Sequence, residues 1–297
     1  MGTALTSVGL PIALAVVMFG LGLSLTVADF ARVVREPKAV AVALATQLVL
    51  LPAVCFGLVS AFGMDPVLAV GMLLLAASPG GTTANLFSHL FRGDVALNIT
   101  LTAVNSVLAV LTLPIVVNLA ISVYEPAIGD GSVGLEFGKV AQVFAIVLVP
   151  VVLGMLVRRW SPAFADRADR PVRIISAVVL VAVIAGALLA ERENLAGYLA
   201  DVGLIAALFC ACSLTAGYFL PRLARVSSRQ AVASAFEVGI HNSTLAITIA
   251  VTVMGSERLA VPAAVYGVIM FPIAAVAGWL FTRAQAPATA KDADSVS

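Results

Sequence analysis

The segment Glu237-Val238-Gly239-Ile240-His241-Asn242-Ser243-Thr244 decides the fold of this chain. It gathers a carboxylate, an imidazole, an amide and two hydroxyls in a stretch, 230–256, that holds no other charged residue. A carboxylate in apolar surroundings is costly unless it is paired, binds a cation or is protonated. The glycine and the polar groups also favour a break in a helix. Glu237 is therefore a candidate functional residue. The alternative is a carboxylate satisfied by neighbouring backbone donors, which serves only to pack helices.

A second stretch, Ser78-Pro79-Gly80-Gly81-Thr82-Thr83-Ala84-Asn85, has the same character within the apolar segment 66–91. Pro79 removes a backbone donor and blocks the hydrogen bond to the preceding turn, and the two glycines after it favour unwinding. The stretch predicts a second broken helix. A simple proline kink here, and a glycine-softened turn in the first segment, are the alternatives.

The composition of the chain places both stretches in a membrane. Of the 297 residues, 61% are hydrophobic and 11% are charged, whereas an ordinary soluble domain carries roughly 25% charged residues. The mean hydropathy is +1.09. These values exclude a soluble globular protein and favour a single integral membrane domain in a lipid bilayer. The net charge of +1 argues against a nucleic-acid partner.

Uncharged stretches long enough to cross a bilayer as helices predict an all-α polytopic membrane protein. There are nine, at about 6–28, 39–62, 66–91, 95–122, 140–157, 174–190, 202–221, 230–256 and 259–282. Lys and Arg are concentrated after the first, third, fifth and seventh spans and in the tail. The positive-inside rule then predicts an outside N-terminus and a cytoplasmic C-terminus in the plasma (inner) membrane. The tail, 285–297, is expected to be disordered.

The two breaks hold equivalent positions in two halves of opposite orientation. Within 39–122 and again within 202–282, three spans follow one another and the middle span is broken. From the charge pattern, the three spans of the first triplet are predicted to run outward, inward and outward, and those of the second triplet inward, outward and inward. Paired broken helices in inverted halves indicate a secondary transporter with its site near the membrane midplane. The expected fold is an inverted-repeat transporter.

Further oxygen donors lie in the neighbouring spans. Asn98, Thr102 and Asn105 form a polar stripe on one helix face, and Gln47 is the only amide in 39–62. With Glu237 and free backbone carbonyls they predict a cage of oxygen ligands for a small monovalent cation. A single negative charge suits Na⁺ better than Ca²⁺. The alternative for the stripe is hydrogen bonding between the helices of a bundle.

At these residues the chain resembles the bile acid:sodium symporter (BASS/SBF) family in its bacterial, nine-helix form. The resemblance lies in 78–82 with Asn85 and 92–97, in 237–243, and in Gln47, five residues before Pro52. It implies a panel domain, about 6–28 and 140–190, and a core domain, about 39–122 and 202–282, in which the two broken helices cross.

The resemblance also implies two Na⁺ sites. The first would consist of Asn85, Asn98, Thr102 and Glu237. The second would consist of Gln47, Glu237, His241 and the backbone carbonyls of Val238 and Ile240.

Two residues depart from the family pattern, and both bear on the number of coupled Na⁺ ions. Family members often have Ser where this chain has Ala84. His241 replaces a common Gln, which exchanges an amide oxygen for a ring nitrogen, a poorer ligand for a hard cation. Because imidazole titrates near neutral pH, His241 is a candidate for making transport pH-sensitive or for letting H⁺ replace one Na⁺. The alternative is a histidine that only hydrogen-bonds within the crossing.

The expected function is Na⁺-driven symport of a bile-acid-like compound or a small carboxylate or sulfonate by alternating access. The protein is expected to be a monomer and not an enzyme. Helix ends at Gly81, Thr82 and Thr83, and at Asn242 and Ser243, would offer backbone N–H groups to the anion. The alternative is an H⁺-coupled or uncoupled exporter of organic anions or oxyanions from the same superfamily. An arsenite exporter would be expected to place a thiol in the crossing, and the three cysteines lie outside both motifs.

Overall fold

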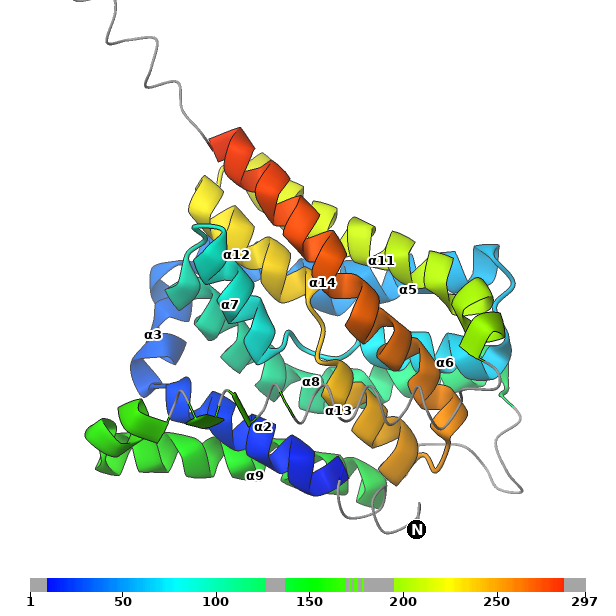
Figure 1. Cartoon of the computed structure of the whole chain (residues 1–297), viewed down its shortest axis with the longest axis horizontal. Helices are drawn as coiled ribbons and strands as arrows, with labels where there is room; N and C mark the ends of the chain where they lie inside the picture. The colour runs from blue at the N-terminus through cyan, green and yellow to red at the C-terminus, as the bar shows by residue number, and fades with distance from the viewer. Residues whose placement is uncertain are drawn as a thin grey trace, which may run out of the picture.

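The computed structural model describes residues 10–126, 137–168, parts of 171–178 and 195–285. Within them the chain is helical and forms no strand (Figure 1). Among these described residues, four helical segments are long and apolar enough to cross a membrane: Pro37–Ala61, Val95–Tyr124, Val202–Leu223 and Glu257–Arg283. The protein is thus an all-α membrane protein, as expected. Most of the predicted span 174–190 and of the tail 285–297 lies outside the described residues, so the nine-helix count stays a prediction.

The helices named here follow the predicted spans, apart from an earlier start of α11 at Leu195 and one exception near the N-terminus. In chain order they are α2 (Leu10–Ser24), α3 (Val27–Arg35), α4 (Pro37–Ala45), the π-helical η2 (Thr46–Leu50), α5 (Leu51–Ala61), α6 (Pro66–Ala76), α7 (Thr82–Leu90), α8 (Val95–Tyr124), α9 (Phe137–Trp160), α11 (Leu195–Leu223), α12 (Ser228–Gly239), α13 (Ser243–Thr248), the π-helical η3 (Ile249–Val253) and α14 (Glu257–Gln285).

The exception is α3, which occupies a segment expected to lie partly in the first span and partly in the loop after it. The first span, predicted to reach residue 28, ends as a helix at Ser24. A new helix starts directly afterwards because Thr26 and Asp29 form a capping box, in which the Thr26 N–H donates to the Asp29 carboxylate at 2.7 Å. The charges of this segment lie on one face of α3, so they did not prevent a helix.

Both predicted breaks are present. The span 66–91 is divided into α6 and α7, and the span 230–256 into α12 and α13. Asp65 caps the first half-helix by accepting hydrogen bonds from the N–H groups of Val67 and Leu68 at 3.0 and 3.3 Å. Pro79 lies between the halves, where a helix could not continue undisturbed. Each half is therefore too short to cross a membrane alone.

The broken helices lie at the centre of the molecule, and apolar side chains cover its outside. Residues 67–81 and 231–250 are all buried. In contrast, α8 buries Asn98, Thr102 and Asn105 but exposes a stripe of apolar side chains. The stripe consists of Val107, Leu111, Ile115 and Leu119. Polar groups inside and apolar groups outside are what a bilayer requires.

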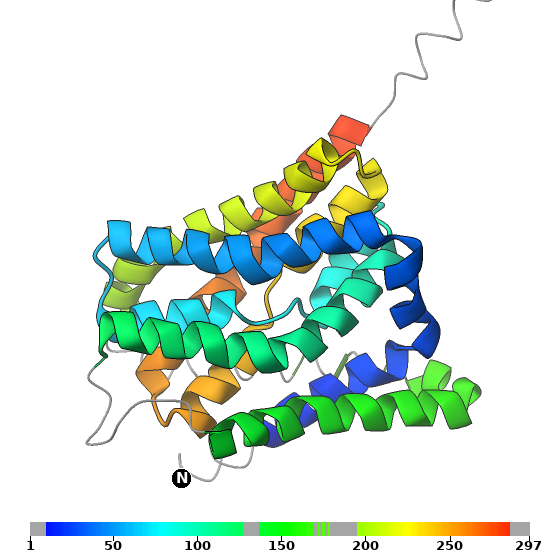
Figure 2. The same ribbon diagram turned by 180° about the vertical axis from the view of Figure 1, so that it is seen from behind.

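Helices α2 and α9 lie side by side along one side of the molecule in both views (Figures 1 and 2). Gly22 and Gly154 allow this close contact, since a Cβ on either residue would overlap the backbone of the other helix. Near their ends, the Arg158 Nε donates to the carbonyl of Leu23. These two helices lie in the segments predicted for the panel, 6–28 and 140–190, and the division into panel and core stays a prediction.

Candidate functional site

The two unwound segments cross each other and pair through their backbones. The Gly81 N–H donates to the carbonyl of Ile240 at 3.1 Å, and the Asn242 N–H donates to the carbonyl of Pro79 at 2.9 Å. This places Gly80 opposite His241 in an antiparallel bridge. Non-helical backbone inside a membrane needs such internal partners. The breaks are thus stable because each supplies hydrogen-bonding groups to the other.

Glu237 lies beside this crossing and has no solvent-exposed surface. The Thr102 hydroxyl donates to its Oε2 at 2.5 Å, and the Asn105 amide nitrogen donates to its Oε1 at 3.0 Å. The polar stripe on α8 therefore faces the carboxylate, and each carboxylate oxygen has a donor that fixes its direction.

A ladder of hydrogen bonds holds α8 parallel to α12 and sets this pairing. At its foot the Asp94 N–H donates to the carbonyl of Arg229 at 2.9 Å. One turn further along, the Asn98 amide nitrogen donates to the carbonyl of Ala233 at 2.7 Å. The bond from Thr102 to Glu237 is the next rung, so each rung advances four residues, about one turn, on both helices. The register of two helices thus brings the carboxylate to the stripe.

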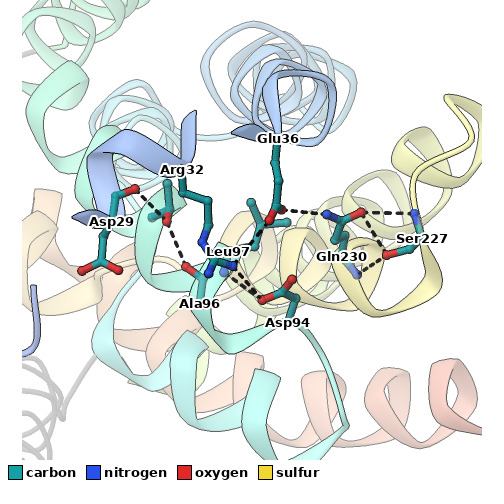
Figure 3. A network of polar contacts seen from close by, with 9 residues as sticks. Asp29, Arg32, Glu36, Asp94, Ala96, Leu97, Ser227 and Gln230 are labelled. Atoms are coloured by element: carbon teal, nitrogen blue, oxygen red, sulfur yellow. Dashed lines mark hydrogen bonds and ion pairs between the residues drawn. The ribbon is translucent and has the colours of Figure 1, made fainter. Parts of the chain in front are cut away.

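The foot of the ladder is fixed by a polar network that the sequence interpretation missed (Figure 3). The Gln230 amide nitrogen donates to the Glu36 carboxylate at 2.7 Å, and Gln230 also forms the capping box of α12 with Ser227. Arg32 lies 3.6 Å from the carboxylate of Asp94, which caps α8. The spacing of Ser227 and Gln230 is a capping-box signature and could have revealed the start of α12, but not its bond to Glu36.

Gln47 and His241, assigned to the second predicted site, do meet. The Gln47 amide nitrogen donates to the carbonyl of Ser78 at 3.0 Å and lies 3.5 Å from His241 Nδ1. His241 Nδ1 lies 3.2 Å from the same carbonyl, and its ring stacks on Phe209 with a centroid distance of 5.4 Å. Gln47 lies in the π-helical turn η2, a departure from α-helix often found at functional sites.

Several buried amide oxygens around the crossing have no hydrogen-bond partner within the described part of the chain. They are Gln47 Oε1 and the Oδ1 atoms of Asn85, Asn98 and Asn105. Buried acceptors are normally satisfied, because an unpaired one costs about 1–3 kcal/mol. Neutral amide oxygens beside a single carboxylate are suitable ligands for a hard monovalent cation.

The helix ends that were predicted to bind the substrate lie directly after the two breaks, at the starts of α7 and α13. Gly81 is the N-cap of α7 and, because glycine has no side chain, makes no side-chain capping hydrogen bond. Asn242 caps α13 by accepting from the Leu245 N–H at 3.0 Å, and the hydroxyl of Ser243 is buried without a partner among the described residues. Thr82 and Thr83 are the first two residues of α7. The roles of these residues toward a substrate stay predictions.

Of the carbonyls assigned to the second cation site, that of Ile240 already accepts the bond from Gly81. Val238 is buried in the last turn of α12. A carbonyl oxygen has two lone pairs, so the bond to Gly81 leaves Ile240 able to accept a second partner. The two carbonyls stay predicted ligands.

The sequence matches a model of the Sodium Bile acid symporter family over residues 11–198. The chain is 28% identical over 255 residues to the protein named uncharacterized sodium-dependent transporter YocS of Bacillus subtilis (strain 168). That match covers 86% of this chain and 77% of the relative.

Two eukaryotic relatives are similar over most of the chain. The probable chloroplastic sodium/metabolite cotransporter BASS1 of Arabidopsis thaliana is 26% identical over 260 residues, which are 86% of this chain and 62% of the relative. The ileal sodium/bile acid cotransporter of Oryctolagus cuniculus is 26% identical over 243 residues, which are 81% of this chain and 68% of the relative.

Proposed function

This chain belongs to the sodium bile acid symporter family, whose members are sodium-coupled transporters and not enzymes, and we propose that it carries a small organic anion together with Na⁺ by alternating access. The observation that carries the proposal is the buried carboxylate of Glu237 at a crossing of two broken helices, among buried amide oxygens without partners.

The coupling ion binds at Glu237. Asn85, Asn98 and Thr102 complete one site, and Gln47, His241 and the backbone at 238–240 complete a second. The unpartnered oxygens of Gln47, Asn85 and Asn98 support this assignment, because a cation would satisfy them. Glu237 supplies the negative charge that a monovalent cation balances.

The organic anion binds where the half-helices start. The uncapped first turn of α7 presents backbone N–H groups and the positive end of the helix dipole near the crossing. Gly81, Thr82 and Thr83 lie at that end, and Asn242 and Ser243 lie at the start of α13. A bound cation at Glu237 lowers the repulsion between the carboxylate and the anion, so each ligand raises the affinity for the other.

Alternating access moves a panel, which includes α2 and α9, against a core that includes the broken helices. The movement bends the chain at Leu25 and Thr26. On one side of this joint, α2 is held to α9 by the close glycine contacts and by Arg158. On the other side, α3 is held to the core by the pairing of Arg32 with Asp94, and the α3–α4 junction by the bond between Glu36 and Gln230.

The transporter acts in the plasma (inner) membrane as a monomer, with its N-terminus outside. The charge distribution between the helices supports this orientation, because Lys and Arg gather on the side of the C-terminal tail. Cysteine accessibility at engineered positions in each loop would test it.

A screen for ligand binding tests the proposed function. The purified protein would be heated with a library of organic anions, with Na⁺ and with K⁺ as the control cation, and hits would be tested for uptake into proteoliposomes. We expect at least one anion to raise the Tm only with Na⁺, by linkage, and to be taken up only with an inward Na⁺ gradient. Uptake that is independent of the Na⁺ gradient would overturn the proposal.

A further inference from the structure

Asn105 is bound to the carboxylate of Glu237. The sequence groups it with the oxygen donors of a cation cage, but it belongs to neither of the two Na⁺ sites that the family resemblance implies. It lies on α8 three residues after Thr102, so both side chains project from the same helix face. Its side chain is 1% exposed. Its amide nitrogen donates to Glu237 Oε1 at 3.0 Å, while Thr102 donates to the other carboxylate oxygen.

The other end of the Asn105 amide has no partner among the residues that the structure describes. Its Oδ1 is buried and accepts no hydrogen bond within the described residues. Leu would fill the same volume without this penalty, so burial alone gives no reason for an amide here. Because Oδ1 and Nδ2 are attached to one carbon, Oδ1 stays within a few ångströms of the carboxylate. Oxygens at such a spacing are able to share one cation.

We propose that Asn105 is a further ligand of the coupling cation, so that its Nδ2 directs Glu237 Oε1 and its Oδ1 binds the ion. This inference rests on the proposed function. A neutral oxygen adds to the coordination without adding charge, which suits a monovalent ion balanced by one carboxylate. Ligand number and geometry also set which cation a site prefers, so Asn105 contributes to the choice between Na⁺ and Li⁺.

Kinetics of uptake in proteoliposomes test the proposal. The half-saturating concentrations of Na⁺ and of Li⁺ would be measured for the wild type, Asn105→Leu and Asn105→Asp. The control is Ser122→Ala at an exposed position of α8. We expect Asn105→Leu to raise the Na⁺ value roughly tenfold, with the maximal rate nearly kept, and to change the Li⁺/Na⁺ ratio. The control should keep both values.

Together, Asn105→Leu and Asn105→Asp separate a failure of the proposed role of Asn105 from a failure of the proposed function. Asn105→Asp keeps an oxygen and should bind Na⁺ better than Asn105→Leu, so it tests the idea even if the leucine variant does not fold. Wild-type Na⁺ affinity and Li⁺/Na⁺ ratio in folded Asn105→Leu, with uptake still Na⁺-dependent, would overturn the role of Asn105 alone. If Asn105→Leu does not fold, a roughly tenfold loss of Na⁺ affinity in folded Asn105→Asp, which keeps an oxygen, would overturn it instead. Uptake by the wild type that ignores Na⁺ would instead overturn the proposed function.

Discussion

Gly80 lies directly against Glu237, so that a Cβ atom on residue 80 would overlap the carbon and both oxygens of the carboxylate. The overlap arises because the backbone bridge to His241 brings the two broken helices into contact. Glycine is required at residue 80 by this close approach of backbone and carboxylate. The position of the carboxylate and the course of the first break therefore depend on each other.

We expect Gly80→Ala to abolish Na⁺-dependent uptake and to lower the Tm. The added methyl group has to push away a buried carboxylate that Thr102 and Asn105 hold in place. Uptake and Tm would be measured beside Gly57→Ala, because a Cβ at Gly57 meets nothing within 4 Å. Normal uptake by Gly80→Ala would show that the carboxylate has more room than the structure gives it.

Glu237→Gln should remove both Na⁺-dependent uptake and the rise of Tm that Na⁺ causes. The substitution keeps the size of the side chain but removes the charge that balances the cation. The exposed Glu257 at the start of α14 offers a matched control, and Glu257→Gln should behave as the wild type. If Glu237→Gln still responds to Na⁺ with unchanged affinity, the ion binds elsewhere.

Exchange of His241 for Gln tests the second cation site. The variant places an amide near Gln47 and the Ser78 carbonyl, where the wild type has a ring nitrogen. An amide oxygen is the better ligand for Na⁺, so the Hill coefficient for Na⁺ should rise. The control is His89→Gln on the exposed end of α7. Unchanged Na⁺ dependence in a folded His241→Gln would remove His241 from the site.

Tyr266→Phe should lower the stability of the crossing without changing its charge. The Tyr266 hydroxyl donates at 2.8 Å to the carbonyl of Gly239, the last residue of α12. Loss of such a buried bond costs about 1 kcal/mol, which would appear as a lower apparent Tm in detergent. The control Tyr218→Phe removes a tyrosine hydroxyl away from the crossing. An equal fall of the Tm in this variant would argue against a special role of Tyr266.

A cross-link between the α3–α4 junction and α12 should leave transport intact. In a Cys212→Ser background, the cysteines of Glu36→Cys and Gln230→Cys would be joined by a short bifunctional thiol reagent. The two positions are close enough, because Gln230 Nε2 lies 2.7 Å from Glu36 Oε2 in the native protein. Uptake should continue if α3 moves with the core and the chain bends at Leu25 and Thr26. Loss of uptake on cross-linking, compared with the same variant before the reagent is added, would place the moving boundary between the α3–α4 junction and α12 instead.

Part of the candidate site could be predicted from the sequence because it depends on neighbours along the chain. Pro79 and the glycines after it interrupt a helix wherever they occur, and the polar run after Glu237 weakens a helix in an apolar span. Both breaks are therefore confirmed at the expected positions. The expected meeting of Gln47 with His241 is also present.

Other features depended on partners far away in the sequence. The charged segment 27–35 was expected to end a span and form a loop, yet it is helix α3, stabilised by its own capping box and held by Asp94 of α8. The polar stripe with Asn105 was expected to form a cage with Glu237, but nothing local showed that Thr102 and Asn105 are the members that donate to the carboxylate. The spacing of Ser227 and Gln230 indicates a capping box at the start of α12, but nothing in the sequence indicates that Gln230 binds Glu36.

The sequence by itself determined that the chain lies in a membrane, where its central helices break and that one carboxylate is buried among oxygen donors. Hydropathy and backbone chemistry decide these properties within a few residues. Only the tertiary structure decided which donors meet the carboxylate, because this depends on the rotation and register of α8 against α12. The ladder from Asp94 to Thr102 fixes that register and thereby brings Thr102 and Asn105 to Glu237.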